Sequence, residues 1–555
     1  MSARKAAIEK YGLLGLALLL AFTLRLYWML TQAPVVSFEA EYIRVAQNLR
    51  AGLGLMSSYG GPETMYAPLY SILIAGFSLV VKNAEVAAHL VSLLFGTLLV
   101  LPIFYLTRWV YGVRAAYLGA FLVAVQPLLV ARGGSIYTEA VYPTLLLAAL
   151  YWGIKAIDQV SLKYCFLSGA FFGLSYLTKP EAFAYPIFFA FMCFAMALVK
   201  RKGFAKVVLA PMLVVAGFAV VASPYVAYLH AETGSWRLEG KWDINYTTGM
   251  QIHSGLNDWQ ALYGINDNEQ ERGPLLDPER FAAYTPYPHS ASDKLKYMET
   301  AVRLNREAAY EIFLSTQLGE PFVLILIAIG LFSYGWDKER LLHEFVLAIM
   351  VLSIFVLVIT APHVEFRYTD ASVPLMIPWV AKGLDELGRW ARNLVERAAG
   401  KLAPRAGAFA AAAQLAMVIP MVVVSFADTR TLTEFKIEQS GYMGVKQAGL
   451  WLRKQLPEDR RVAAMNSVVP YYSSSTLVQF PYAGSRQTLH YFDSREVNFI
   501  VLDGHFSKDF PTIADWLAHG IPSGRAKLVY DSGGAPDSRI EIYRWQKATT
   551  ISAGF

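Results

Sequence analysis

The chain has 555 residues, of which 55% are hydrophobic and 17% are charged, and its formal net charge is +6. A soluble globular protein of this length has no place for so much apolar surface, so the composition excludes that class. Apolar runs of about 16–25 residues recur over most of the chain and indicate a polytopic membrane protein.

The N-terminus begins with a short basic segment before its first apolar run, Leu13–Leu30. A signal peptide has the same order, but Arg25 and the bulky pair Tyr27–Trp28 do not fit a cleavage site of small residues. We therefore predict an uncleaved first transmembrane helix whose N-terminus lies in the cytoplasm.

The stretch Ser37–Val81 carries two carboxylates, Glu39 and Glu41, at the point where the first span leaves the bilayer. Apolar positions recur at helical spacing from Tyr42 to Leu49, which predicts a short amphipathic helix. Acidic residues at a membrane boundary are costly without a task, so we interpret this stretch as the active-site loop of a membrane enzyme. Two solvated acids in the first turn of a helix are the alternative interpretation.

Further apolar runs follow the first one along the chain. They lie at about 66–81, 84–107, 114–131, 140–157, 163–178, 182–199, 205–229, 321–336, 342–361, 366–384 and 406–427. If all of them cross the membrane, the basic segments Lys200–Lys202 and Arg389–Arg405 lie outside, against the positive-inside rule. Placing 66–81 along the membrane surface returns both segments to the cytoplasm. We therefore predict a mainly α-helical protein with about 11 transmembrane helices and interfacial helices in the first outer loop.

This threading brings the ionisable residues of interest to the outer face. That face receives Glu39 and Glu41, the turn 132–139, Lys179–Glu181, the loop 230–320, the segment 362–367 and everything after Asp428. The cations Lys179, Arg132 and Arg367 can hold a phosphate there, while anchoring at the headgroup level is the alternative interpretation. A carboxylate can act as a general base, and an acidic pair can hold a divalent metal.

The composition becomes that of a soluble protein after Asp428. Predicted strands are Arg461–Asn466, Val497–Leu502, Lys527–Tyr530 and Arg539–Arg544, and predicted helices are Gly444–Leu456 and Thr512–Ala518. Alternating helices and strands predict a small α/β domain. We therefore divide the chain into a transmembrane catalytic domain, 1–427, with outer loops 34–83 and 230–320, and an extracytoplasmic α/β domain, 428–555. Within the second loop, Ser290–Thr316 has helical periodicity.

Four motifs occur in order over about residues 10–385. They are the acidic loop with Tyr42, AQNL and YAPLY (which begins at Tyr66), TEAVYP at Thr138–Pro143, YLTKPEA at Tyr176–Ala182, and FRYTDASVPLMIP at Phe366–Pro378. Together they resemble GT-C glycosyltransferases, in particular the bacterial branch related to protein mannosyltransferases and lipid A aminoarabinose transferases (glycosyltransferase family 39). The resemblance implies transfer of a hexose or pentose from a polyprenyl-phosphate carrier to an acceptor outside the cytoplasmic membrane, usually with inversion.

The resemblance also implies roles for single residues. The family's loop acid falls on Glu39 or Glu41, whereas relatives often have Asp at the position of Phe38. We favour Glu39 as the base, because Glu41 adjoins Tyr42 and points to a different side of the helix start. Expected phosphate-binding residues are Lys179, Arg132 and Arg367, and other active-site residues are Tyr42, Glu139, Glu181 and Tyr66. No cofactor is firmly predicted; if a divalent metal binds, Glu39 and Glu41 are its ligands.

The expected partners are a polyprenyl-phosphate-sugar donor, the lipid bilayer, and a lipid, polysaccharide or protein acceptor, with no nucleic acid. The expected location is the cytoplasmic membrane of a bacterial-type cell, with the active site facing the periplasm or the exterior. A transporter or flippase of lipid-linked sugars is the alternative, although it explains poorly why acids and cations gather at one face and not at mid-membrane. A membrane-anchored binding or sensor protein is a third alternative, but eleven spans are far more than an anchor requires.

Overall fold

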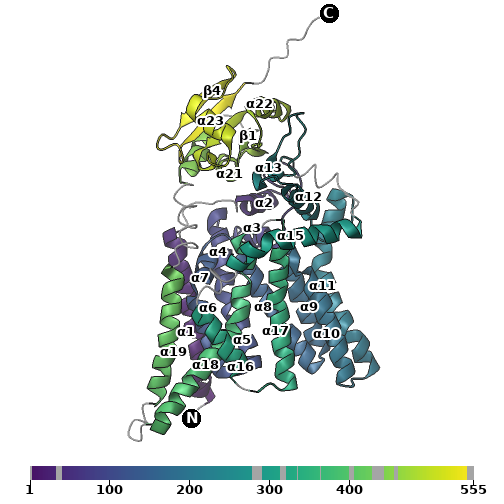
Figure 1. Ribbon diagram of the computed structural model, residues 1–555, viewed down its shortest axis with the longest axis vertical. Coiled ribbons are helices and arrows are strands. Elements are labelled where there is room, and N and C mark those ends of the chain that lie inside the picture. Colours follow the sequence, from purple (N-terminus) through teal and green to yellow (C-terminus); the bar gives the residue numbers. More distant parts are fainter. Residues whose placement is uncertain are drawn as a thin grey trace, which may run out of the picture.

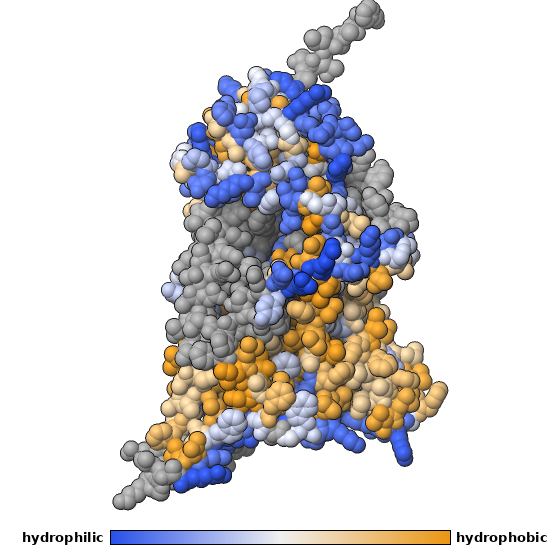
Figure 2. All heavy atoms as spheres, in the orientation of Figure 1, coloured by the Kyte–Doolittle hydropathy of each residue, from blue (hydrophilic) through white to orange (hydrophobic). Residues whose placement is uncertain are grey.

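A long helical bundle carries a small sheet domain at one end (Figure 1). The computed structural model describes residues 3–32, 40–277, 290–312, 321–333, 335–362, 364–398, 406–427, 443–455 and 460–546. Figure 2 shows apolar side chains around the bundle, and hydrophilic side chains over the sheet domain and at the opposite end. This distribution fits a bundle that lies in a membrane and a domain that stands in water.

Six helical segments among the described residues are long and apolar enough to cross a bilayer. They are α1 (Ala3–Gln32), α4 with α5 (Ala84–Leu98 and Val100–Tyr111), α8 (Thr138–Gln159), η1 with α10 (Pro180–Ala184 and Tyr185–Val199), α11 (Phe204–Thr233) and α17 (Lys338–Ile359). A seventh span is formed if α6 (Val113–Val125) and α7 (Pro127–Gly134), which meet at 57°, cross together.

Helices are present in all eleven predicted regions, but the count of eleven spans is not confirmed. The remaining four regions form α9 (Leu162–Tyr176), α16 (Pro321–Phe332), α18 (Ser372–Ala398) and α19 (Ala406–Ala427). The 15 residues of α9 reach only about 22 Å, whereas the hydrocarbon core is about 30 Å thick. The middle of α18 carries buried charged residues, including the Lys382–Glu386 pair, which lower its hydropathy.

Short helices of the outer loops lie between the bundle and the sheet domain (Figure 1). They are α2 (Ala40–Arg50), α3 (Leu69–Phe77), α12 (Trp242–His253), α13 (Asp258–Tyr263) and α15 (Ala291–Ile312). The nine residues of α3 reach about 14 Å and are too few to cross a bilayer, which agrees with the predicted non-spanning segment. Helix α15 lies inside the region 290–316 where helical periodicity is found.

A break between α6 and α7 is stabilised by Arg25 of α1. Pro127 has no N–H, so the carbonyl of Val123 lacks its helical partner. The guanidinium of Arg25 donates to that oxygen at 3.0 Å and to the oxygen of Ala124 at 3.2 Å. Gly133 makes room for this side chain, because a Cβ there would lie 2.7 Å from Cδ of Arg25. The buried arginine therefore determines how α7 ends, where Arg132 lies.

The sheet domain contains five strands in the order β2-β1-β3-β5-β4. They are β1 (Arg461–Ala464), β2 (Thr476–Gln479), β3 (Phe499–Asp503), β4 (Ala526–Asp531) and β5 (Ile540–Trp545), with helices α21 (Val468–Ser473), α22 (Ser485–Ser494) and α23 (Pro511–His519). Strand β1 is parallel to β2 and β3, and β5 is antiparallel to β3 and β4. The four predicted strands and the helix at 512–518 are present, whereas the sequence did not indicate β2 or α22.

The sheet domain packs directly on the first outer loop. Ile43 of α2 and Val462 and Leu477 of the sheet belong to one apolar cluster. The amide of Leu477 donates to the carbonyl of Ser58 at 2.8 Å, so the loop pairs with the free edge of β2. Arg44 donates to the carbonyl of Pro470 at 2.8 Å. The predicted domain boundary at 428 lies outside the described residues.

Candidate active site

Glu41 lies buried in the first turn of α2, which begins at Ala40. The segment forms a helix because the apolar positions that follow Glu41 recur at helical spacing. Its carboxylate accepts a hydrogen bond from the amide of Ser58 at 2.7 Å and another from the Ser58 hydroxyl. Burial raises the pKa of Glu41, and these hydrogen bonds oppose that rise. The other predicted acid, Glu39, lies outside the described residues.

Glu63 is a second buried carboxyl group, which the sequence interpretation missed. It accepts hydrogen bonds from the amides of Met65 at 2.7 Å and Tyr66 at 2.8 Å, and so caps the turn before YAPLY. Burial, and then the negative charge of Glu41, raise the pKa of Glu63 to about 8. Burial and the charge of Glu41 therefore favour the protonated form of Glu63. The sequence signal that could have identified Glu63 is its position three residues before Tyr66, the first residue of the YAPLY motif.

Tyr42 and Tyr66 are brought together, as the acidic-loop motif suggested. Their rings meet edge to face at 5.2 Å, and Tyr42 meets Tyr70 in the same way at 5.3 Å. The ammonium of Lys241 lies 3.8 Å from the centre of the Tyr66 ring, which is a cation–π contact. Gly240 allows this approach, since a Cβ there would lie 1.6 Å from the carbonyl oxygen of Thr64.

Lys241 was also missed, because its loop contains no motif. Burial, and then the positive charge of Arg367, lower the pKa of Lys241 to about 8. Across the described residues, Lys241 takes part in no ion pair. Arg367 pairs with Glu365 at 2.6 Å, and 43% of its side chain is exposed. Two cations that repel each other in a partly buried setting form a place where an anion is stabilised.

A second group joins the ends of α8 and η1. The ammonium of Lys179 lies 3.1 Å from the carboxylate of Glu139 and 3.8 Å from that of Glu181. Glu139 is in the first turn of α8 and accepts a hydrogen bond from the Thr138 hydroxyl at 2.9 Å. Pro180 begins η1 directly after Lys179, which places Glu181 one residue further on the same turn. Three predicted residues therefore form one cluster.

Arg132 forms a buried ion pair with Asp370, with 2.5 Å between Nε and Oδ2. The guanidinium also lies 4.6 Å from the centre of the Tyr137 ring. Asp370 belongs to the FRYTDASVPLMIP motif, but its type and position alone did not indicate that it would pair with Arg132. The ends of α7 and η3 (Phe366–Thr369) are joined by this contact.

We expect the substitution Asp370→Asn to destabilise the protein by about 3–5 kcal/mol, because it leaves the buried charge of Arg132 without its partner. Thermal unfolding of the purified protein in detergent measures this loss. Glu365→Gln is the matched control, since it breaks the exposed pair with Arg367 and should cost at most about 1 kcal/mol. Equal effects of the two substitutions would show that the Arg132–Asp370 pair contributes no more than a surface contact.

Comparisons with known proteins agree with this architecture. The family profile of dolichyl-phosphate-mannose-protein mannosyltransferases matches residues 65–228. Archaeal oligosaccharyltransferase AglB from Archaeoglobus fulgidus, solved with an inhibitory peptide and a dolichol-phosphate, is similar with a TM-score of 0.56 and 14% identity, over 98% of this chain and 75% of that chain. ArnT from Cupriavidus metallidurans, bound to undecaprenyl phosphate, is similar with a TM-score of 0.55 and 13% identity, over 96% of this chain and 98% of that chain.

The fold of this chain is therefore similar to the folds of AglB and ArnT. The resemblance that the motifs indicated is confirmed at the level of the fold. The several apolar helices indicate a multi-pass membrane protein. No match was found among curated protein sequences. AglB has also been solved in complex with zinc and sulfate, and that structure is similar with a TM-score of 0.54 and 14% identity, over 96% of this chain and 73% of that chain.

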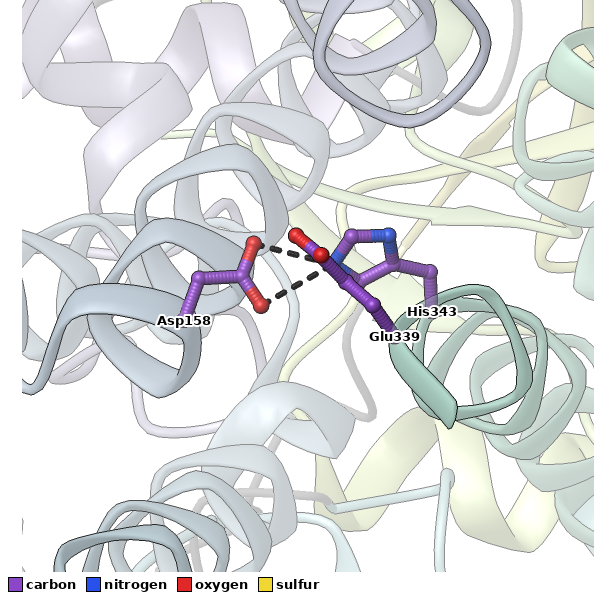
Figure 3. Close-up of side chains that lie close together, drawn as sticks. All are labelled: Asp158, Glu339 and His343. Atoms are coloured by element: carbon purple, nitrogen blue, oxygen red, sulfur yellow. Dashed lines mark hydrogen bonds and ion pairs between the residues drawn. The ribbon is translucent and has the colours of Figure 1, made fainter. Parts of the chain in front are cut away.

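One group of three histidine and carboxylate side chains in the described parts of this chain has the spacing of a metal site. It consists of Asp158, Glu339 and His343 (Figure 3). Asp158 and Glu139 lie near opposite ends of α8, so this group is remote from the cluster described above. The predicted metal ligands Glu39 and Glu41 do not belong to it, and Glu39 lies outside the described residues.

Proposed function

We propose that this protein is a GT-C glycosyltransferase that transfers a sugar from a polyprenyl-phosphate-linked donor to an acceptor on the outer face of a cytoplasmic membrane, with inversion. The observation that carries the proposal is the gathering of the buried carboxyl groups Glu41 and Glu63 and of the cation Lys241 around α2, beneath the sheet domain (Figure 1). The structures of AglB and ArnT that contain dolichol-phosphate and undecaprenyl phosphate support a polyprenyl-phosphate donor.

The donor's leaving group is a phosphate, so developing negative charge must be stabilised as the bond to the sugar breaks. We assign the direct contact to Lys241 and Arg367, because Lys241 forms no close ion pair among the described residues and Arg367 is partly exposed. Lys179 and Arg132 are each paired with buried carboxylates, so we assign them to holding the surrounding helices and to the wider positive field.

The acceptor hydroxyl must lose a proton as its oxygen attacks the anomeric carbon, and a carboxylate base accepts that proton. The bond from the sugar to the phosphate breaks in the same displacement and releases polyprenyl phosphate. The two hydrogen bonds from Ser58 give Glu41 a positioning role, and burial favours the protonated form of Glu63. Both observations support Glu39 as the base.

A cavity of about 330 Å³ lies between the second outer loop, 230–320, and the sheet domain. Its lining includes Gln260 and Arg272 from the loop and Tyr482, Phe510 and Thr512 from the domain. Aromatic faces with a few polar groups suit a saccharide or a peptide segment. We therefore propose that the loop 230–320 and the C-terminal domain contact the acceptor, which is a lipid, a polysaccharide or a protein.

The test is an assay of purified protein in lipid vesicles with synthetic undecaprenyl-phosphate-linked hexoses and pentoses. We expect the sugar–phosphate bond to be cleaved and polyprenyl phosphate to appear, with the sugar found on an added envelope extract by mass spectrometry. A flippase, the alternative function, moves the donor between leaflets and leaves that bond intact. Leaflet exchange without cleavage of any donor would contradict transferase activity.

A further inference from the structure

The group formed by Asp158, Glu339 and His343 lies far from the candidate active site. Residues 139 and 158 are 19 positions apart in α8, which corresponds to about 29 Å along the helix. Glu339 and His343 are four residues apart in the first turns of α17, so they share one face of that helix. The group therefore joins the end of α8 to the start of α17.

The side chains converge from both helices (Figure 3). Nε2 of His343 lies 2.9 Å from each carboxylate oxygen of Asp158, and one ligand atom from each of the three residues lies within 4.8 Å of the others. The indole N–H of Trp109 donates to Asp158 at 2.6 Å and orients that carboxylate. Such an outer partner is usual for carboxylate ligands of metals.

The charges of the group are unbalanced. Two carboxylates lie close together, and across the described residues no cation or hydrogen-bond donor pairs with Glu339. The neighbouring Arg340 is directed to Glu344 instead, at 3.3 Å. Lys200 donates to the backbone carbonyl of Asp158 and does not pair with its carboxylate. A cation between the two carboxylates would relieve their repulsion.

We propose that Asp158, Glu339 and His343 bind a divalent transition metal of the Zn²⁺ type, which clamps the end of α8 to the start of α17. One imidazole and two carboxylates are a ligand set that Zn²⁺ accepts, and water completes the coordination on the exposed side of Glu339. His343 is buried, so the metal is reached from that side. The role is structural, because the active-site candidates lie at the other end of α8.

Metal content of the full-length protein in detergent tests this proposal. The protein is stripped with a chelator, equilibrated with Zn²⁺, freed of excess metal and analysed by mass spectrometry of the element. We expect about one equivalent in the wild type, and at least a tenfold loss of affinity in His343→Gln and Glu339→Gln. Matched controls are His519→Gln and Glu307→Gln, which change exposed residues outside the group and should retain the metal.

Thermal unfolding gives a second readout. Zn²⁺ should raise the melting temperature of the stripped wild type and leave that of His343→Gln unchanged, because binding to the folded state alone stabilises it. A wild type that retains no zinc would overturn the proposal and leave the contact of His343 with Asp158 as the link between the two helices. Zinc retained equally by His343→Gln would also overturn it, since the metal would then be bound elsewhere.

Discussion

Replacing Glu39 by glutamine is expected to lower turnover by about 10²–10⁴-fold, which is the usual contribution of a general base. Glutamine keeps the size of the side chain and cannot accept the acceptor's proton. Affinity for the lipid donor should change little, because we assign its phosphate to Lys241 and Arg367. Single-turnover cleavage of a synthetic donor, measured beside equilibrium binding of undecaprenyl phosphate, separates the two effects.

Glu41→Gln is the matched comparison in the same loop. Its amide oxygen can still accept one of the hydrogen bonds from Ser58, so a much smaller loss of turnover is expected. If the two glutamates held a catalytic metal, both substitutions would abolish activity and chelators would do the same. A dead Glu41→Gln beside an active Glu39→Gln would reverse the assignment. Activity in both would move the base to Glu139 or Glu181.

Lys241→Met is expected to weaken binding of undecaprenyl phosphate by about 10–100-fold, since a hydrogen bond to a charged group contributes about 1.5–3 kcal/mol. Methionine keeps the length of the side chain and its contact with Tyr66, but it removes the charge. Titration of the purified protein with fluorescent undecaprenyl phosphate measures the affinity. Lys296→Met, at an exposed position of α15, is the control and should bind normally.

The lowered pKa of Lys241 predicts that the affinity for undecaprenyl phosphate depends on pH. The pKa of Lys241 is lowered to about 8, so the side chain is charged below that pH and becomes neutral above it. Affinity of the wild type for undecaprenyl phosphate should therefore fall as the pH rises from about 7 through 8 to about 9, one unit either side of that pKa. Lys241→Met should show no such fall over this interval. A wild-type profile that stays flat there would contradict a role for Lys241 in phosphate binding.

The sequence was most informative where motifs mark the ends of spans. Glu139 and Lys179 were expected on one face, and they lie 3.1 Å apart because a membrane topology restricts span ends to two planes. Asp370 and Glu63 lie within or beside the motifs quoted for the resemblance, but residue type alone does not show which acids become buried. Their contacts with Arg132 and with the turn before Tyr66 depend on tertiary structure.

Other features left little trace in the sequence. Lys241 reaches the Tyr66 ring because Gly240 passes against the backbone of Thr64, and such an approach has no periodic signal. Strand β2 has only four residues and gains its place by pairing with β1 on one edge and with the carbonyl of Ser58 on the other. The count of eleven spans is not confirmed for the related reason that hydropathy alone does not give the length at which α9 ends.

The pairing of the first outer loop with the sheet domain has a consequence for the time course of biosynthesis. Arg44 is translated 426 residues before its partner Pro470. At a synthesis rate of about 5–20 residues per second, roughly 20–85 s pass between synthesis of the first outer loop and synthesis of the strand edge that pairs with Ser58. During that interval the membrane helices are already inserted, while the support of Glu41 is incomplete. We therefore expect activity to begin only after the whole chain has been synthesised. A prematurely terminated chain should be inactive and transfer no sugar to wrong acceptors.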